Sequence, residues 1–165
     1  MNTRSERRAE WKKVKQKLKN PLVRRILKDE MERGSGTEVY RLDDGGNGKP
    51  LFLNISKMKT WAKENCEVFA MPVDMDRADR LVKSGAVGED HIFDHTIKTD
   101  LTPIIVCQGM SAGDQIVDGA HRFVAMCLGS TIFGLEVSIP GYVLSHNEWK
   151  QFVIPNTVAN QCGFF

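Results

Sequence analysis

The chain has 165 residues, a mass of 18.6 kDa and a net charge of +2. Its 41% hydrophobic and 27% charged residues are typical of one folded domain and exclude disorder as its main state. No apolar run approaches the roughly 20 residues that cross a bilayer, and the first 33 residues are charged where a signal peptide carries an apolar segment. We therefore expect a cytoplasmic protein without a membrane partner.

The pattern of the four cysteines agrees with a cytoplasmic location. They contain no CxxC pair, and two of them lie in apolar stretches where a thiol packs as a small hydrophobic group. We expect reduced thiols at Cys66, Cys107, Cys127 and Cys162.

Charge is concentrated at the N-terminus. Residues 1–33 hold twelve Lys or Arg against five acidic residues, a net charge of +7, which leaves −5 for the rest of the chain. Such an arm attracts a polyanion, and the residues we expect to contact DNA are Arg7, Arg8, Lys12, Lys13, Lys15 and Lys19. The alternative is a solvated amphipathic helix pair, because Trp11 is the arm's lone aromatic residue and single-strand binders usually interleave several.

The arm also carries helix signals. Apolar residues at spacings of three and four predict a first helix, and Asn20 followed by Pro21 is typical of the start of a second one, which we expect to run to about Arg33. The glycines that follow end it. We therefore predict a basic helical arm over 1–36 and a single domain over 37–165.

Turn and cap residues mark the elements between 37 and 101. A Gly- and Asp-rich turn predicts a hairpin over 37–54, and Asp74 is positioned as the N-cap of a helix. We expect a helix at Ser56–Asn65, a strand at Val68–Val73, a helix at Met75–Ser84 and an irregular segment at 86–101. In that segment Asp90, His91, Asp94 and His95 have a spacing that can bind a metal on a helix, although a polar surface loop explains them as well.

The last third alternates apolar strands with helices. We expect a strand at Pro103–Cys107, a turn at Gly109–Gly113 and a returning strand at Gln115–Val117. A helix at His121–Leu128, stopped by Gly129, should follow, and then a strand at Thr131–Ile139. After a turn at Pro140-Gly141 we expect a helix near His146–Phe152, with Trp149 and Phe152 in the core. This mixture of hairpins and interspersed helices favours the α+β class.

The segment Ile116–Ala125 is the strongest functional signal, because it reads as a strand, a glycine turn and a helix start. Gly119 permits close approach of a ligand, and the free N–H groups of the helix start attract an anion. Arg122 can clamp a phosphate, His121 can transfer a proton, and Asp118 can hold magnesium or accept a proton. On spacing alone, a capped turn with a solvated first helical turn is an equal alternative.

The order of elements over roughly residues 66–139 resembles the ParB/sulfiredoxin superfamily, in which a strand, a Gly-x-(His or Arg)-Arg turn and a helix bind nucleotide phosphates. Gly119, His121 and Arg122 match that turn, and Asp118 matches the acid that precedes the glycine in many ParB-like domains. The resemblance implies a mixed sheet with surrounding helices, preceded here by the basic arm.

Two departures narrow what the resemblance implies. Sulfiredoxins carry their reactive cysteine immediately before the His-Arg pair, where this chain has Ala120, so sulfinic acid repair is not expected. Chromosome-partitioning members continue into a helix-turn-helix region, whereas only 26 residues follow Ile139. Centromere reading of that kind is therefore not expected either.

The resemblance thus implies binding of ATP or CTP at Gly119, Ala120, His121 and Arg122, with Mg²⁺-dependent hydrolysis or phosphotransfer. We assign Asp118 and His121 as catalytic candidates, and Asp74 and Glu67 as further candidates for an acid or a metal ligand. Two alternatives stay open: a noncatalytic DNA-binding regulator or inhibitor that uses the arm, and a metal-dependent DNase.

Overall fold

The computed structural model describes residues 38–87, 101–134 and 138–161, together with six isolated residues of the arm. The six described arm residues have helical backbone. The rest of the two helices predicted in the arm, the predicted boundary after residue 36 and most of the irregular segment at 86–101 lie outside the described residues. The chain divides into two compact units: unit 1 comprises Met1–Met58 with Gln151–Phe165, and unit 2 comprises Lys59–Lys150. Each unit is described by itself.

Unit 1 contains the predicted hairpin. Strands β1 (Val39–Leu42) and β2 (Leu51–Asn54) pair antiparallel across a turn in which Asp44 Oδ1 accepts the N–H groups of two glycines at 2.8 and 3.1 Å. β2 also pairs with β7 (Val153–Ile154), which helix α8 (Asn156–Gln161) follows. The sequence pattern did not predict β7 and α8, because β7 is only two residues long.

Helix α3 (Ile55–Asn65) confirms the helix predicted at Ser56–Asn65. It begins directly after β2, where Asn54 Oδ1 accepts the Lys57 N–H at 3.1 Å. Met58 and Ala62, four residues apart, are fully buried on one side of the helix. From Lys59 onward α3 belongs to unit 2.

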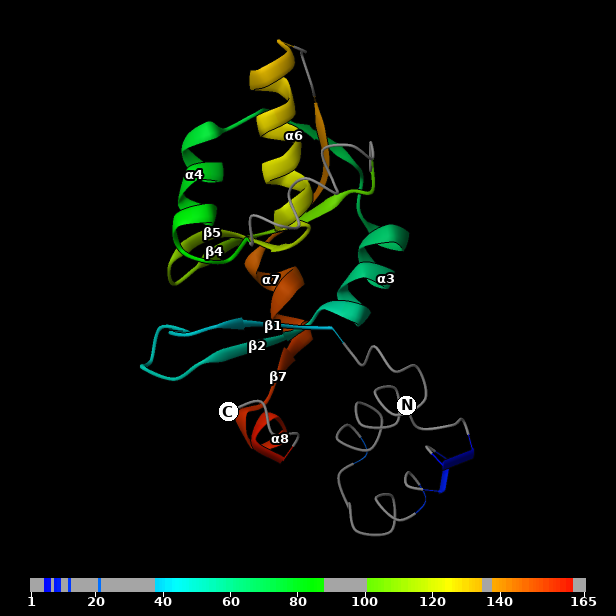
Figure 1. Ribbon diagram of the computed structural model, residues 1–165. Coiled ribbons are helices and arrows are strands. Elements are labelled where there is room, and N and C mark those ends of the chain that lie inside the picture. Colours follow the sequence, from blue (N-terminus) through cyan, green and yellow to red (C-terminus); the bar gives the residue numbers. More distant parts are fainter. Residues whose placement is uncertain are drawn as a thin grey trace. The chain divides into compact units, whose positions relative to one another are not determined.

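Unit 2 is built on a sheet that has the order β3-β6-β4-β5 in the described residues. Its strands are β3 (Phe69–Met71), β4 (Ile104–Met110), β5 (Gly113–Asp118) and β6 (Ile139–Leu144). The pairs β3–β6 and β4–β5 are antiparallel, whereas β4 and β6 are parallel. Two sheets with interspersed helices make the described chain α+β, as predicted (Figure 1).

Two helices pack side by side over this sheet: α4 (Met75–Lys83) and α6 (Ala120–Phe133) (Figure 1). Asp74 caps α4 as predicted, because its Oδ1 accepts the Arg77 N–H at 2.9 Å. Ala78 is buried between the helices, and Phe123 lies in the same core.

The prediction for the end of α6 was wrong. The helix passes through Gly129 and ends at Gly134, whose φ of 64° suits a C-terminal glycine. Residues from Thr131 therefore extend the helix, and the strand begins only at Ile139. The Thr131 hydroxyl donates to the Cys127 carbonyl four residues earlier at 3.0 Å, a bond that lets this β-branched residue fit helical backbone.

The turn predicted at Pro140-Gly141 was also wrong, because both residues lie within β6. Gly141 pairs with Phe69 on one side and Ile104 on the other. A Cβ at Gly141 would collide with Met71 Sδ and come within 3.3 Å of Ile104 Cγ1. This glycine therefore makes room for neighbouring side chains instead of forming a turn.

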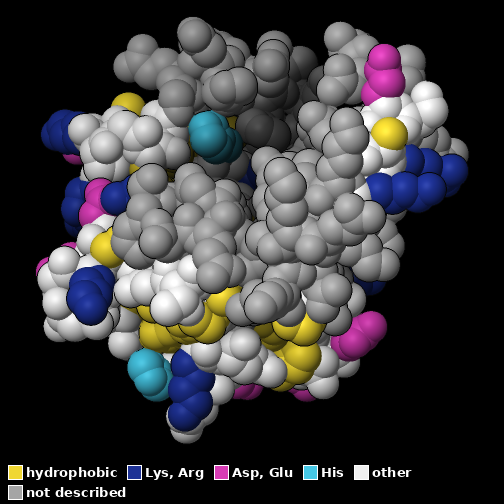
Figure 2. Space-filling model, turned by 90° about the horizontal axis from the view of Figure 1, so that it is seen from below, with side chains coloured by type: hydrophobic (Ala, Val, Ile, Leu, Met, Phe, Trp, Pro, Cys, Tyr) yellow, Lys and Arg dark blue, Asp and Glu magenta, His cyan; other side chains and the backbone are white. Residues whose placement is uncertain are grey.

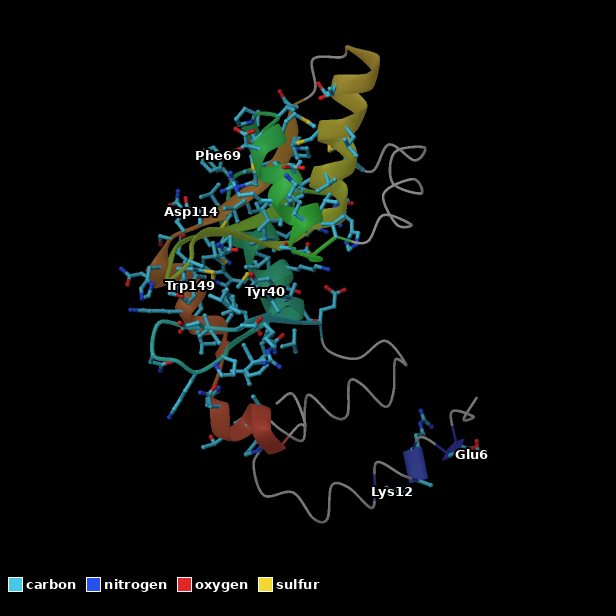
Figure 3. The ribbon with its side chains drawn as sticks, turned by 60° about the vertical axis from the view of Figure 1, so that its left-hand side comes forward. Glu6, Lys12, Tyr40, Phe69, Asp114 and Trp149 are labelled. Atoms are coloured by element: carbon cyan, nitrogen blue, oxygen red, sulfur yellow. The ribbon has the colours of Figure 1, made fainter. Side chains whose placement is uncertain are left out.

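The helix predicted near His146–Phe152 is confirmed at the C-terminal end of unit 2. Helix α7 (His146–Trp149) starts with a capping box between Ser145 and Glu148, and a 3₁₀ turn, η1 (Lys150–Phe152), follows it. Trp149, which is labelled in Figure 3, is buried. Its Nε1–H donates to Gln108 O at 2.7 Å. This hydrogen bond holds α7 against β4.

Within the described ranges, none of the helices is both long enough and apolar enough to cross a membrane.

Hydrophobic side chains do reach the surface of the described residues, and Figure 2 shows several beside Lys and Arg side chains on the face that it draws. Among large hydrophobic residues, Leu101, Val68 and Phe69 are the most exposed, at 61%, 54% and 52%.

Candidate functional site

The turn between β5 and α6 has the geometry that its sequence predicts. β5 ends at Asp118, and Gly119, with a φ of 84°, is the N-cap of α6. A Cβ at Gly119 would lie 2.6 Å from Ile104 Cγ2 and 2.7 Å from Arg122 Nη2, which is closer than such atoms can approach. Glycine is therefore required twice here, for the left-handed backbone and for the guanidinium that lies against it.

Two cations converge on the Asp118 carboxylate. Arg122 Nη2 lies 3.3 Å from Asp118 Oδ2, and Lys59 Nζ of α3 lies 3.4 Å from Oδ1. The Asp118 and Arg122 side chains are only 14% and 15% exposed, so water screens their attraction less than it screens a surface ion pair. All three groups belong to unit 2.

The Arg122 guanidinium is held mainly through one nitrogen. Nη2 also donates to the main-chain carbonyl of Pro103 at 3.2 Å, whereas Nε is buried and has no hydrogen-bond partner in the described structure. A buried donor without a partner costs about 1–3 kcal/mol. Arg122 therefore retains donor capacity that an additional acceptor would satisfy.

The first turn of α6 has no side-chain cap. Because the N-cap is a glycine, no side-chain oxygen closes this helix end. Ala120 and His121 follow in the first turn and are half-buried. The positive end of a helix of 14 residues thus lies beside the Asp118–Arg122 ion pair.

The predicted residues Asp118, Gly119, Ala120, His121 and Arg122 accordingly share one turn. The other two predicted carboxylates are used differently: Asp74 caps α4, and Glu67 is exposed ahead of β3. No contact described for unit 2 joins either of them to Asp118. The described residues also contain no cluster of three or more His, Cys, Asp or Glu side chains that could hold a metal ion by itself.

Most of the remaining sequence-predicted residues cannot be placed in this way. Among the DNA-binding candidates, Arg8 and Lys12 are described as exposed residues of helical backbone. The others lie outside the described residues, as does the candidate metal segment: Arg7, Lys13, Lys15, Lys19, Asp90, His91, Asp94 and His95.

Sequence reasoning missed Lys59 and the Pro103 carbonyl. Lys59 is far from Asp118 in the sequence, and no spacing rule connects a lysine on α3 with the end of β5. The Pro103 carbonyl belongs to the main chain and has no residue-type signal at all. The pattern also treated Arg122 as available for phosphate, whereas the structure pairs it with Asp118.

Comparison of the chain with family models, with characterised proteins and with solved structures finds no match.

Proposed function

We propose that unit 2 binds a nucleoside triphosphate at the first turn of α6 and hydrolyses it with Mg²⁺. The observation that carries the proposal is the convergence of Lys59 and Arg122 on Asp118 beside the open end of α6. Two cations, unclosed helix N–H groups and one carboxylate are the parts from which phosphate sites with a metal are commonly built.

Each cation suits a different task at a polyphosphate. Arg122 presents a planar guanidinium that can bind two oxygens at once, and its Nε has no acceptor among the described residues. Lys59 is a compact charge on a flexible stem, and its side chain is 39% exposed, so it can follow a phosphate oxygen over a short distance. Together they favour a ligand with several adjacent anionic groups.

Asp118 makes the proposed binding depend on a metal. Its negative charge lies between the two cations and would repel a phosphate group placed there. Mg²⁺ is usually held by one or two carboxylates together with substrate phosphates, and Asp118 fits as that carboxylate. When bound, the ion would neutralise charge on the phosphates.

His121 is the nearest candidate for proton transfer in this turn. It lies in the first turn of α6, adjacent to Arg122, and an imidazole has one nitrogen that can accept a proton and one that can donate. We assign it the task of accepting or returning the proton of the attacking water.

Calorimetric titration of ATP and CTP, with and without Mg²⁺, tests the binding step. We expect the chain to bind one of them with Mg²⁺, and Arg122→Ala to weaken that affinity at least about tenfold, the effect of about 1.4 kcal/mol. Arg41→Ala is the matched control, because Arg41 also pairs with a carboxylate, Asp43 at 3.0 Å, but is exposed in unit 1. Undiminished binding by Arg122→Ala, or no binding of either nucleotide, contradicts the proposal.

Phosphate release tests the hydrolytic step separately. We expect Asp118→Asn to abolish Mg²⁺-dependent release while leaving metal-free nucleotide affinity equal or higher, because the substitution removes a repelling charge. Release that persists in Asp118→Asn assigns hydrolysis elsewhere, even if the nucleotide binds at α6.

A further inference from the structure

A second feature of unit 2 lies away from the first turn of α6. An open groove of about 470 Å³ runs between α4 and the start of β5. It is lined on the helix side by Arg77, Arg80, Leu81 and Ser84, and on the hairpin side by Ala112, Asp114, Gln115 and Ile116. β5 rises about 3.3 Å per residue, which places Asp114 roughly 13 Å from Asp118 along the strand.

The hairpin wall of the groove is an edge strand. In the sheet order of the described residues, β5 has β4 as its one neighbour. Arg77 Nη2 reaches the main-chain carbonyl of Asp114 from α4, at the long distance of 3.5 Å. A carbonyl of β5 therefore lies beside the groove, where its contact with Arg77 is long and weak and the N–H of an added strand would be a better donor.

The charges along the groove favour an acidic ligand. Arg77 and Arg80 lie three residues apart on α4, so their side chains share a face. Arg80 is exposed, and its guanidinium has no side-chain partner in the part of unit 2 that the structure describes. The facing carboxylate, Asp114, already accepts the Gly109 N–H at 3.0 Å within the hairpin.

The groove also has an apolar floor. Ile116 is 7% exposed, and Leu81 packs against the same core from α4. An extended peptide points alternate side chains to opposite faces, so it can set apolar groups on this floor and carboxylates toward the arginines. A nucleic acid strand fits less well, because its continuous phosphates would pass the Asp114 carboxylate and its backbone has no N–H groups for β5.

We propose that an acidic peptide segment of a partner protein adds to β5 as an extra antiparallel or parallel strand, with its carboxylates on Arg77 and Arg80. The main-chain hydrogen bonds supply most of the affinity, and the two arginines select acidic sequences. This proposal concerns residues distinct from the candidate nucleotide site and does not depend on it.

Fluorescence anisotropy tests the proposal with a labelled peptide of alternating glutamate and valine, about six residues long, the usual length of a strand. We expect saturable binding to the full chain that weakens about tenfold in Arg80→Glu, because the substitution turns an attraction into a repulsion. Lys83→Glu is the matched control: it makes the same charge change on the same helix, but Lys83 does not line the groove and pairs with Asp79. Thermal unfolding of both variants checks that they fold.

Two further probes separate strand addition from simple charge attraction. The same peptide with every main-chain nitrogen methylated loses all its main-chain donors but keeps its carboxylates, and we expect it to bind about tenfold more weakly. Equal affinity for the methylated peptide, an equal loss in Lys83→Glu, or no binding of the unmodified peptide overturns the proposal. Stronger binding of a labelled single-stranded DNA that Arg80→Glu abolishes would assign the groove to nucleic acid instead.

Discussion

The two helices that pack together in unit 2 each have an aspartate shortly before their first residue, and the two aspartates have different partners. Asp74 is the N-cap of α4, and Asp118 is the last residue of β5, one residue before the N-cap of α6. Asp74 turns its carboxylate onto its own helix and accepts the Arg77 N–H at 2.9 Å. Asp118 lies one residue further from its helix and pairs instead with Lys59 and Arg122.

The difference comes from one glycine. Gly119 takes the N-cap position of α6 with a left-handed backbone, so Asp118 lies outside the cap position and its carboxylate pairs with side chains. The end of α4 is therefore closed by a side chain, whereas the end of α6 lacks such a cap. A local hydrogen bond explains Asp74 completely, but the ion pairs of Asp118 leave a positive helix end available for an anion.

The largest effect on stability is expected from a substitution in the turn that precedes α6. Gly119→Ala should lower the free energy of unfolding by about 3 kcal/mol, because it combines left-handed strain with a collision at Ile104 and Arg122. Gly134→Ala at the other end of α6 is the control, since its φ is 64° but nothing lies within 4 Å of the added Cβ. Gly134→Ala should lower the free energy of unfolding by about 1 kcal/mol, which is the cost of the left-handed backbone strain alone. Urea unfolding measures both, and equal losses would show that the contacts at Gly119 do not matter.

A smaller effect distinguishes the ion pair from a cap. Asp118→Ala should cost about 2 kcal/mol, because it leaves the mostly buried Arg122 guanidinium without its carboxylate. Asp118→Ser should not restore this stability, since a hydroxyl replaces neither the charge nor the reach to Lys59. Restoration by serine in urea unfolding would mean that Asp118 acts as a cap after all.

At α4, in contrast to α6, we expect serine to replace the aspartate with little loss of stability. Asp74→Ala should cost about 1 kcal/mol, the usual loss for a helix cap, and Asp74→Ser should recover most of it. Nucleotide titration should give the same affinity for Asp74→Ala as for the unchanged chain. A marked loss of nucleotide affinity would return Asp74 to the candidate site.

The smallest expected effect concerns the thiol that joins the two helices. Cys127 Sγ of α6 lies 3.9 Å from Asp74 O, and burial, the main cause, raises the pKa of this thiol above its usual 9.0. A raised thiol pKa means that the unfolded chain ionises first, so stability present below pH 9.0 declines as the pH rises above it.

Cys127→Ala should therefore flatten the alkaline fall of unfolding free energy, measured by urea unfolding between about pH 8 and 10. Part of the slope should remain, because burial raises the pKa of the Cys107 thiol to about 12. A slope unchanged by Cys127→Ala would show that this thiol ionises equally in both states.

Local patterns predicted much of the fold and the turn of the candidate site. The hairpin over 37–54, the helix after it, the Asp74 cap and the strand-turn-helix around Gly119 are all confirmed. The end of α6 and the place of Pro140-Gly141 were not predictable in this way. Pro140-Gly141 lies in a strand because β6 pairs with β3 and β4, which are distant in the sequence. At the end of α6, continuation of the helix outweighs the β preference of single residues.

The sequence by itself therefore determined features whose hydrogen bonds and backbone angles lie within a few residues, such as the Asp44 turn, the Asp74 cap and the left-handed Gly119. Tertiary structure alone decided the parallel pairing of β4 with β6 and the approach of Lys59 to Asp118. It also decided the groove that joins Arg80 to the edge of β5. These features bring together residues far apart in the chain, and only the packing of whole elements sets such distances.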